Sequence, residues 1–428
     1  MVSRQTSFAL ETGTRKTVFL LTWLVGLGFY LSLCGRHFIA SYYAGRPNRE
    51  NLLRAAWLEP QNSEYQYLLG RYSQWIAREP DTALRYYRAA IALNPHKASY
   101  WFDLSTVYQL TGNHAQESIA LQQAILTDPT SPEIAWEAAN LAWAQGDRAK
   151  ALREFRTAMD GDASLAPAAL ERCWRINPDV DAILKEAVPP KTDVYSSFLS
   201  FLITKNDAVG TGKLWRRLME LQQPVEQRYV FEYVRYLVDR HAVEEANRAW
   251  QDAGRLSDLS AYQTTPDNLV INSDLSLPLL NAGFDWSYER VAGVSMTLDA
   301  VEARSGHPAL AIAFDSPGVE DAGMRQMIPV EPGSRYEFSA YFKTEDLQGA
   351  GGARLSLEDY YTRASLFSTD DLKDAAFWKP TSGRFTTGPE TTLLLLRLQH
   401  VPPQTAIRGK LWIDGIRLTK DDAVARVQ

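Results

Sequence analysis

The side chains able to act as nucleophiles, bases or metal ligands are scattered along this chain. Its six histidines include no pair at the i, i+4 spacing of a helical metal site, and no CxxC, GxSxG or phosphate-loop pattern occurs. Consecutive carboxylates such as Glu244 and Glu245 diverge on a helix, so they indicate a solvated face. The glycine-rich stretch at 349–352 falls between two expected strands and therefore indicates a loop. We therefore expect a protein that is not an enzyme and needs no cofactor.

Composition sets the class of protein. The chain has 428 residues, 45% of them apolar and 22% charged, which predicts a folded protein of more than one domain. A net charge of -6 argues against nucleic acid as a partner, because phosphate binding needs a basic surface. A disulfide between Cys34 and Cys173 would tie the apolar N-terminal segment to a distant predicted helix, so none is expected, and the two cysteines leave the redox compartment undecided.

Residues 17–35 form an uncharged apolar segment near the N-terminus. These 19 residues would span roughly 28 Å as a helix, about the thickness of a bilayer core. We expect a single-pass membrane helix with residues 1–16 as a cytoplasmic tail. The aromatic residues expected at the membrane interface are Tyr30, Phe38, Tyr42 and Tyr43.

Two other interpretations of this segment stay open. It follows basic residues, as a cleaved signal peptide would, although it is longer than a typical signal core and lacks a clear cleavage site. Residues 31–34 approximate a lipobox ending at Cys34, but Leu33 stands where a small residue is expected. Basic residues flank the segment almost equally, so charge alone does not set its orientation.

A small residue recurs every 34 positions, at Ala56, Ala90, Ala124 and Ala158. Three residues before each alanine stands a larger apolar one: Leu53, Tyr87, Leu121 and Phe155. A period of 34 with a small residue at a helix contact is typical of helix-hairpin arrays.

On these residues the segment 47–262 resembles tetratricopeptide repeats. Within the clearest repeat, at 98–130, Trp101, Leu104 and Tyr108 share one helical face and Gly112 marks the turn. The resemblance implies an all-α solenoid of five or six helix pairs, the last ones irregular, that binds partner proteins. Candidate partner-binding residues, for which packing between repeats is the alternative role, are Tyr72, Asp103, Tyr108, Asn140 and Trp143.

From about residue 267 to 420 the pattern changes to short alternating strands broken by Gly and Pro. At 336–342 the residues Tyr336, Phe338, Ala340 and Phe342 place one apolar face inward, as a half-buried strand requires. We expect further strands at 309–314, 325–330, 354–358, 393–399 and 410–418, forming a β-sandwich before a short tail at 421–428.

The order of several short motifs resembles the galactose-binding-like jelly roll of carbohydrate-binding modules. These motifs are 268–272, 283–286, 305–307, 330–336, Trp378, Phe385 and 409–414. The resemblance implies an all-β jelly roll that either binds glycan or serves as a structural sandwich.

A sugar site would use aromatic rings against apolar C–H faces and carboxylates against hydroxyls. Candidate glycan-binding residues are Tyr360, Tyr361, Trp378, Trp286, Glu358 and Asp359, with Trp286 expected more readily in the core. Related modules hold a structural calcium ion. Asp414 matches their terminal-strand aspartate, whereas Gly415 stands where a second acidic residue often occurs.

The chain is therefore expected to be multidomain: a transmembrane helix, a tetratricopeptide solenoid and a jelly-roll sandwich. The first hypothesis is a non-catalytic scaffold in the bacterial inner membrane, its bulk periplasmic or otherwise extracytoplasmic. It would bind protein partners through the repeats and polysaccharide through the sandwich, in exopolysaccharide or surface-glycan assembly. A purely structural adaptor is the alternative. A third, a glycan-active enzyme, requires a carboxylate pair across a cleft.

Overall fold

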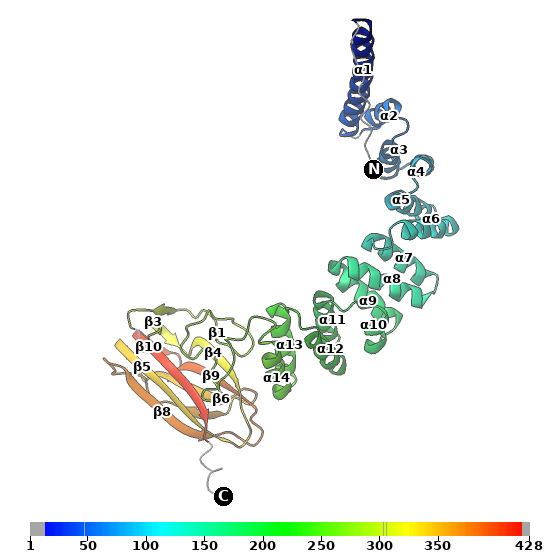
Figure 1. Cartoon of the computed structure of the whole chain (residues 1–428). Helices are drawn as coiled ribbons and strands as arrows, with labels where there is room; N and C mark the ends of the chain where they lie inside the picture. Colours follow the sequence, from blue (N-terminus) through cyan, green and yellow to red (C-terminus); the bar gives the residue numbers. More distant parts are fainter. Residues whose placement is uncertain (1–12, 47, 303, 305, 422–428) are drawn as a thin grey trace, which may run out of the picture. The chain divides into compact units, whose positions relative to one another are not determined.

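The computed structural model describes residues 13–46, 48–302, 304 and 306–421. The predicted tails at 1–16 and 421–428 fall mostly outside these residues. A long apolar helix, a series of helix pairs and two antiparallel sheets follow one another along the chain, so the predicted fold class is confirmed (Figure 1). Contacts divide the chain into two compact units, 1–189 and 190–428, so the boundary falls inside the segment 47–262.

The first unit consists of helices. They are α1 (Gly13–Ala44), α2 (Arg49–Leu58), α3 (Ser63–Arg71), α4 (Pro80–Leu93), α5 (Ala98–Leu110), α6 (His114–Thr127), α7 (Pro132–Ala144), α8 (Arg148–Gly161), α9 (Ala166–Ile176) and α10 (Val180–Glu186). A π-helical turn, η1 (Tyr72–Ala77), continues α3, and a short 3-10 turn, η2 (Ala163–Leu165), precedes α9.

The 34-residue period corresponds to the second helix of successive pairs. Ala90, Ala124 and Ala158, on α4, α6 and α8, are fully buried, as a close helix contact requires. Leu53, by contrast, is 44% exposed, because α2 belongs to the first pair and has repeat neighbours on one side. Ala56 on the same helix is buried.

The turns inside the pairs explain why the pattern repeats. Gly112 and Gly146 take φ of 72° and 82°, a left-handed conformation that glycine adopts without strain. The next residue in each case, Asn113 or Asp147, caps the following helix by accepting a backbone N–H. His241 occupies the same kind of left-handed turn, with φ of 62°, in the last pair.

The second unit begins with α11 (Thr192–Thr204), α12 (Ala208–Glu220), α13 (Gln227–Asp239) and α14 (Val243–Ala253). The strands follow: β1 (Ser287–Tyr288), β2 (Val294–Asp299), β3 (Ala309–Val319), β4 (Asp321–Pro329), β5 (Arg335–Gly349), β6 (Gly352–Asp359), β7 (Ser365–Ser368), β8 (Lys379–Thr386), β9 (Leu393–Val401) and β10 (Thr405–Lys420). One sheet has the order β1-β4-β9-β6-β7 and the other β2-β3-β10-β5-β8, all pairs being antiparallel.

The sandwich core lies between the two sheets. Tyr336, Phe338, Ala340 and Phe342 of β5 are buried there, as the alternating pattern predicted. The outward face of the first sheet carries Arg325 on β4 directly opposite Arg397 on β9. That face borders the last helix pair, α13 and α14, and the candidate site lies there.

Candidate functional site

Aromatic contacts join α13 and α14 to the sandwich. Tyr361, in the turn after β6, stacks on His241 with ring centroids 3.9 Å apart and donates its hydroxyl proton to the Val238 carbonyl at 2.8 Å. Trp250 of α14 meets Phe284 edge to face at 5.8 Å. These contacts hold the helix pair against the sandwich and so fix the relative positions of α13 and β4.

Gly283 makes the approach of Trp250 feasible. Its φ is 61°, and a Cβ atom built on it would lie 2.0 Å from the nearest carbon of the Trp250 ring. The indole in turn donates to the Tyr262 carbonyl at 2.7 Å. Glycine is therefore required here both for the backbone conformation and for the space.

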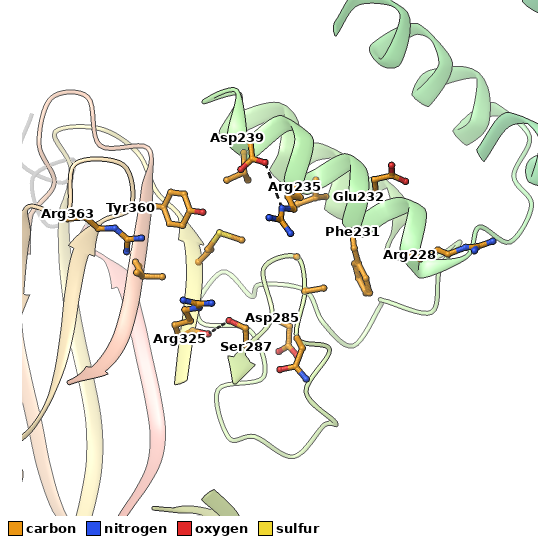
Figure 2. Close-up of a pocket in the computed structure, with 17 residues that line it drawn as sticks. Arg228, Phe231, Glu232, Arg235, Asp239, Asp285, Ser287, Arg325, Tyr360 and Arg363 are labelled. Carbon is orange, nitrogen blue, oxygen red and sulfur yellow. Dashed lines mark hydrogen bonds and ion pairs between the residues drawn. The ribbon is translucent and has the colours of Figure 1, made fainter. Parts of the chain in front are cut away.

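A cleft of about 680 Å³ lies between α13 and the strands β1, β4 and β9 (Figure 2). Apolar side chains such as Phe231 and Met327 form part of its wall. Four arginines line it as well: Arg228, Arg235, Arg325 and Arg363. The volume is in the range of small-ligand sites.

Three of these arginines point into the cleft from different elements: Arg235 from α13, Arg325 from β4 and Arg363 from the turn after β6 (Figure 2). Their charges are weakly neutralised. Arg235 is 3.8 Å from Asp239, and Arg325 is 3.7 Å from Glu289. Arg363 lies 5.5 Å from the centre of the Tyr360 ring and makes no ion pair within the described residues. A group of planar donors like this suits a carboxylate or another oxyanion.

Asp285 adds a buried acceptor to the cleft. Its Oδ2 accepts the Leu280 N–H at 2.8 Å, while its buried Oδ1 has no hydrogen-bond partner of normal geometry within the described residues. The Trp286 N–H and the Asn272 side chain lie close enough to favour the carboxylate. Burial outweighs them and raises the pKa of Asp285 to about 6.

Of the six residues predicted to bind glycan, Tyr360 lines the cleft. Tyr361 forms the contact with α13 described above. Glu358 is buried 3.9 Å from Arg397, and Asp359 is buried, accepting the N–H groups of Tyr361 and Thr362 at 3.0 and 2.8 Å. Asp359 therefore holds the turn that carries Tyr360 and Tyr361, and its buried carboxylate does not face a ligand.

The two predicted tryptophans lie elsewhere. Trp286 is 2% exposed and donates to the Asn272 carbonyl at 3.1 Å, so its ring offers no face to a sugar and leaves the candidate site. Trp378 is half-buried just before β8 and does not line the cleft. The sequence-based set missed Arg235, Arg325 and Asp285. Asp285 belongs to the 283–286 motif, whereas Arg235 comes from a helix and had no local signal.

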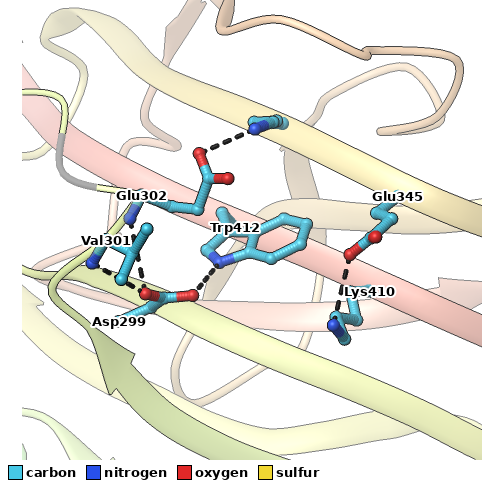
Figure 3. A network of polar contacts seen from close by, with 7 residues as sticks. Asp299, Val301, Glu302, Glu345, Lys410 and Trp412 are labelled. Atoms are coloured by element: carbon cyan, nitrogen blue, oxygen red, sulfur yellow. Dashed lines mark hydrogen bonds and ion pairs between the residues drawn. The ribbon is translucent and has the colours of Figure 1, made fainter.

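The outer face of the second sheet carries an aromatic ring that is already covered. Trp412 donates to Asp299 at 3.0 Å, and this bond lowers the pKa of Asp299 (Figure 3). The ammonium groups of Lys343 and Lys410 lie 5.6 and 5.7 Å from the ring centre. Glu302 and Glu345 pair with these lysines at 2.6 and 3.2 Å. Trp412 is buried, so this network is not a free stacking surface.

The candidate partner-binding residues of the repeats are mostly engaged between helices. Asp103 lies 4.0 Å from Arg71, and burial raises its pKa although Tyr67 favours the charged form. Tyr108 is buried and accepts from Arg88 at 2.6 Å. The remaining three, which are half-buried, are Tyr72, Asn140 and Trp143.

A shallow groove of about 300 Å³ lies between α4, α5 and α6. Tyr108 and Trp101 line it, together with Ile119, whose side chain is 53% exposed. An apolar wall with an exposed isoleucine and the nearby Arg88 is suited to a peptide side chain. This groove is the part of the first unit that best matches the expected partner surface.

The calcium prediction concerned Asp414, which is buried on β10. Within residues 13–46, 48–302, 304 and 306–421, no group of three or more His, Cys, Asp or Glu residues is placed to hold a metal ion. The two cysteines are unbridged, Cys34 being exposed and Cys173 buried.

Solved structures resemble parts of this chain at low sequence identity. No family model matches the chain, and no curated protein matches it. Among solved structures, a CBM4 structure is 14% identical, covers 36% of this chain and 99% of its own, and has a TM-score of 0.28. The Arabidopsis OM64 TPR domain is 19% identical, covering 27% of this chain and 96% of its own at a TM-score of 0.25. Pseudomonas aeruginosa pilF is 16% identical, covering 54% of this chain and 93% of its own at 0.27. Similarity at this level carries no functional assignment.

Proposed function

We propose that this protein is a membrane-anchored, non-catalytic scaffold of the bacterial cell envelope that holds a saccharide in the cleft between α13 and the sandwich. Partner proteins bind to the helical repeats, and the complex serves exopolysaccharide or surface-glycan assembly. The observation that carries the proposal is the cleft itself. It combines convergent arginines with an aromatic ring, Tyr360.

The arginines favour a saccharide that bears a carboxylate or another anionic substituent. Arg235, Arg325 and Arg363 approach from three elements, so one acidic group can receive hydrogen bonds from more than one of them. The Tyr360 ring supports an apolar C–H face of the sugar. Neutral sugars would forgo the charged hydrogen bonds and bind more weakly.

Binding without hydrolysis follows from the state of the carboxylates in the cleft. Glu232 accepts a hydrogen bond from Ser200 and Asp285 is buried, whereas Asp239 is exposed 3.8 Å from Arg235. Among the carboxylates that line the cleft this leaves one accessible group, and a glycosidase needs two carboxyl groups facing each other across the scissile bond. We therefore propose that the ligand is retained intact.

Helix α1 is the proposed anchor. Among the described residues it is the one helix long and apolar enough to cross a membrane, and its apolar span is not buried in the protein. We place it in the inner membrane as a single pass, with the rest of the chain outside the cytoplasm. A reporter fused after residue 428 tests this: activity confined to the cytoplasm would reverse the topology. Release of the mature protein from membranes would favour the signal-peptide interpretation.

The saccharide proposal is tested with the full chain in detergent micelles. Matched neutral and carboxylated oligosaccharides are titrated by calorimetry, and the mixtures are analysed for cleavage products. Arg363→Gln should weaken binding of the acidic member about tenfold or more, because hydrogen bonds to charged groups contribute ~1.5–3 kcal/mol. The matched control is Arg408→Gln on β10, whose exposed side chain pairs with Asp315. Absence of binding to every saccharide, or appearance of cleavage products, would overturn the proposal.

A structural adaptor is the second candidate, and one observation favours it. Tyr361, an aromatic residue expected to meet sugar, instead binds the turn and the last residues of α13. If the sandwich serves to dock on the helices, cleft variants will leave all partner interactions unchanged. Loss of those interactions in Tyr361→Ala, with no saccharide bound by the wild type, would favour the adaptor.

A further inference from the structure

Helix α1 has two parts with different surroundings. Residues 17–35 carry no charge and are exposed along most of their length. From Arg36 onward the same helix is the first member of the first helix pair, because Ala40 is fully buried against Leu52 and Ala55 of α2. No loop separates the two parts. The apolar segment and the first pair are therefore one continuous element.

Two polar contacts fix how far α2 returns along α1. The Arg36 guanidinium donates from Nη2 to the Leu58 carbonyl at 2.5 Å, and His37 Nδ1 lies 2.9 Å from Glu59 Oε1. Helix α2 runs antiparallel to α1, so its C-terminal end comes back to the level at which the uncharged segment stops. The pKa of Glu59 is lowered by its hydrogen bonds from Asn62 and His37, which outweigh burial.

Trp57 stands at this end of α2. By this register its α-carbon lies within about two residues of Arg36 along the axis, or ~3 Å. The interfacial layer of a bilayer is about 5–8 Å thick on each side of a ~30 Å core. Trp57 is 79% exposed, and Leu53, one turn earlier on the same face, is 44% exposed. Tryptophan is the residue most suited to this layer, since its ring is apolar and its N–H is polar.

Of the aromatic residues expected at the interface from the sequence, Phe38 lies at the same level, since it follows Arg36 by two positions and is 72% exposed, whereas Tyr42 and Tyr43 are less well placed. Tyr42 and Tyr43 follow Arg36 by six and seven positions, which puts them ~9–10 Å beyond it. Their rings lie under Arg46 and Arg54, at 4.5 and 5.5 Å. Tyr42 and Tyr43 therefore pack within the first helix pair, beyond the interfacial layer in which a membrane-anchoring ring would lie.

We propose that the end of α2 rests in the bilayer interface with Trp57 as its anchor, so that the first helix pair is docked on lipid. This inference rests on the proposed membrane span of α1. The partner is the headgroup and upper acyl region of the membrane, and the contact needs no specific lipid. It gives the exposed tryptophan a role that packing within the chain does not supply.

The test measures quenching of tryptophan fluorescence by brominated lipids. The full chain is reconstituted into phosphatidylcholine vesicles carrying bromine either near the headgroups or deep in the acyl chains. Trp57→Phe is compared with Trp75→Phe, a matched control whose side chain is 60% exposed. Trp75 lies on η1 in the second helix pair, roughly 18 Å along α3 and η1 from Ser63. Trp23→Phe reports on the span itself.

We expect Trp57→Phe to lose the shallow-bromine quenching contributed by one tryptophan, and Trp75→Phe to lose none. Trp23→Phe should lose quenching by the deep bromines. If Trp23 is quenched but Trp57 contributes no shallow quenching, the docking inference is overturned while the anchor stands. If neither is quenched, α1 does not span the bilayer and the proposed anchor fails with it.

Discussion

Replacing Gly283 by alanine is expected to loosen the joint between α14 and the sandwich. Two costs add at this position. A side chain at φ of 61° is strained by about 1–2 kcal/mol. The new Cβ would also stand 2.0 Å from the Trp250 ring, which is fully buried and hydrogen-bonded to the Tyr262 carbonyl, so the ring has little room to move. Overpacking of this kind costs about 1–3 kcal/mol.

Gly333→Ala is the matched control. Gly333 lies in the same sandwich at φ of 62°, but a Cβ added there would meet nothing within 4 Å, so alanine incurs the backbone strain alone. The difference between the two variants isolates the Trp250 contact at about 1–3 kcal/mol. In calorimetry of the full chain, each kcal/mol of this difference should appear as a difference of ~2–4 °C between the melting temperatures of the two variants. Hydrogen exchange should locate the loosening in α14. Equal melting shifts for the two variants would refute the close packing of Trp250 on this loop.

Three further changes test other parts of the molecule. Burial raises the pKa of Asp285 to about 6 from its ordinary value of 3.8, so the folded state binds this proton more tightly than the unfolded state. The protonated side chain therefore contributes stability that is fully present below pH ~4 and is lost as the pH rises through 6. The free energy of unfolding falls by at most about 3 kcal/mol over this range. Asp285→Asn should therefore gain stability relative to wild type between pH 4 and 7 in urea unfolding, and a difference independent of pH would contradict the burial. Ala124→Leu should lower the free energy of unfolding by about 1–3 kcal/mol, because Ala124 is fully buried. The control Ala115→Leu, on the exposed face of α6, should be near neutral. Equal melting temperatures for the two variants would show that the repeat register is misassigned. Tyr361→Phe should cost about 0.5–1.5 kcal/mol through loss of the bond to Val238 and speed hydrogen exchange at the end of α13, and unchanged exchange would argue against this contact.

The helix pairs could be predicted from sequence because successive pairs repeat the same residue types at the turn and at the helix contact. Gly112 and Gly146 give the turn its left-handed residue, and the buried alanines Ala90, Ala124 and Ala158 set the helix spacing. The strands β3, β4, β5, β6, β9 and β10 were predicted as well, since alternation such as that of β5 follows directly from one buried face. These features depend on neighbours in the sequence. The strands β1, β2, β7 and β8 were not predicted, because few of their residues are buried.

The candidate site was largely out of reach for the opposite reason. Arg235 and Arg325 are 90 positions apart and belong to a helix and a strand that meet through tertiary packing. Tyr360 and Tyr361 were both predicted to meet glycan, and nothing local in the sequence indicated that α13 would cover Tyr361. The end of α1 was missed as part of the first pair because Arg36 and His37 were interpreted as the flank of a span rather than as contacts to α2.

The uninterrupted passage of α1 into the first helix pair has a mechanical consequence. As the proposed membrane anchor, a span of 19 uncharged residues would tilt where the hydrocarbon layer is thinner than its length and stand upright where the layer is thicker. A flexible linker would absorb that change, but here Ala40 is clamped against α2, so any tilt of the helix turns the first repeat with it. The thickness of the bilayer would then set the orientation of the first helix pair relative to the membrane plane. That orientation would determine which partner proteins can reach the pair.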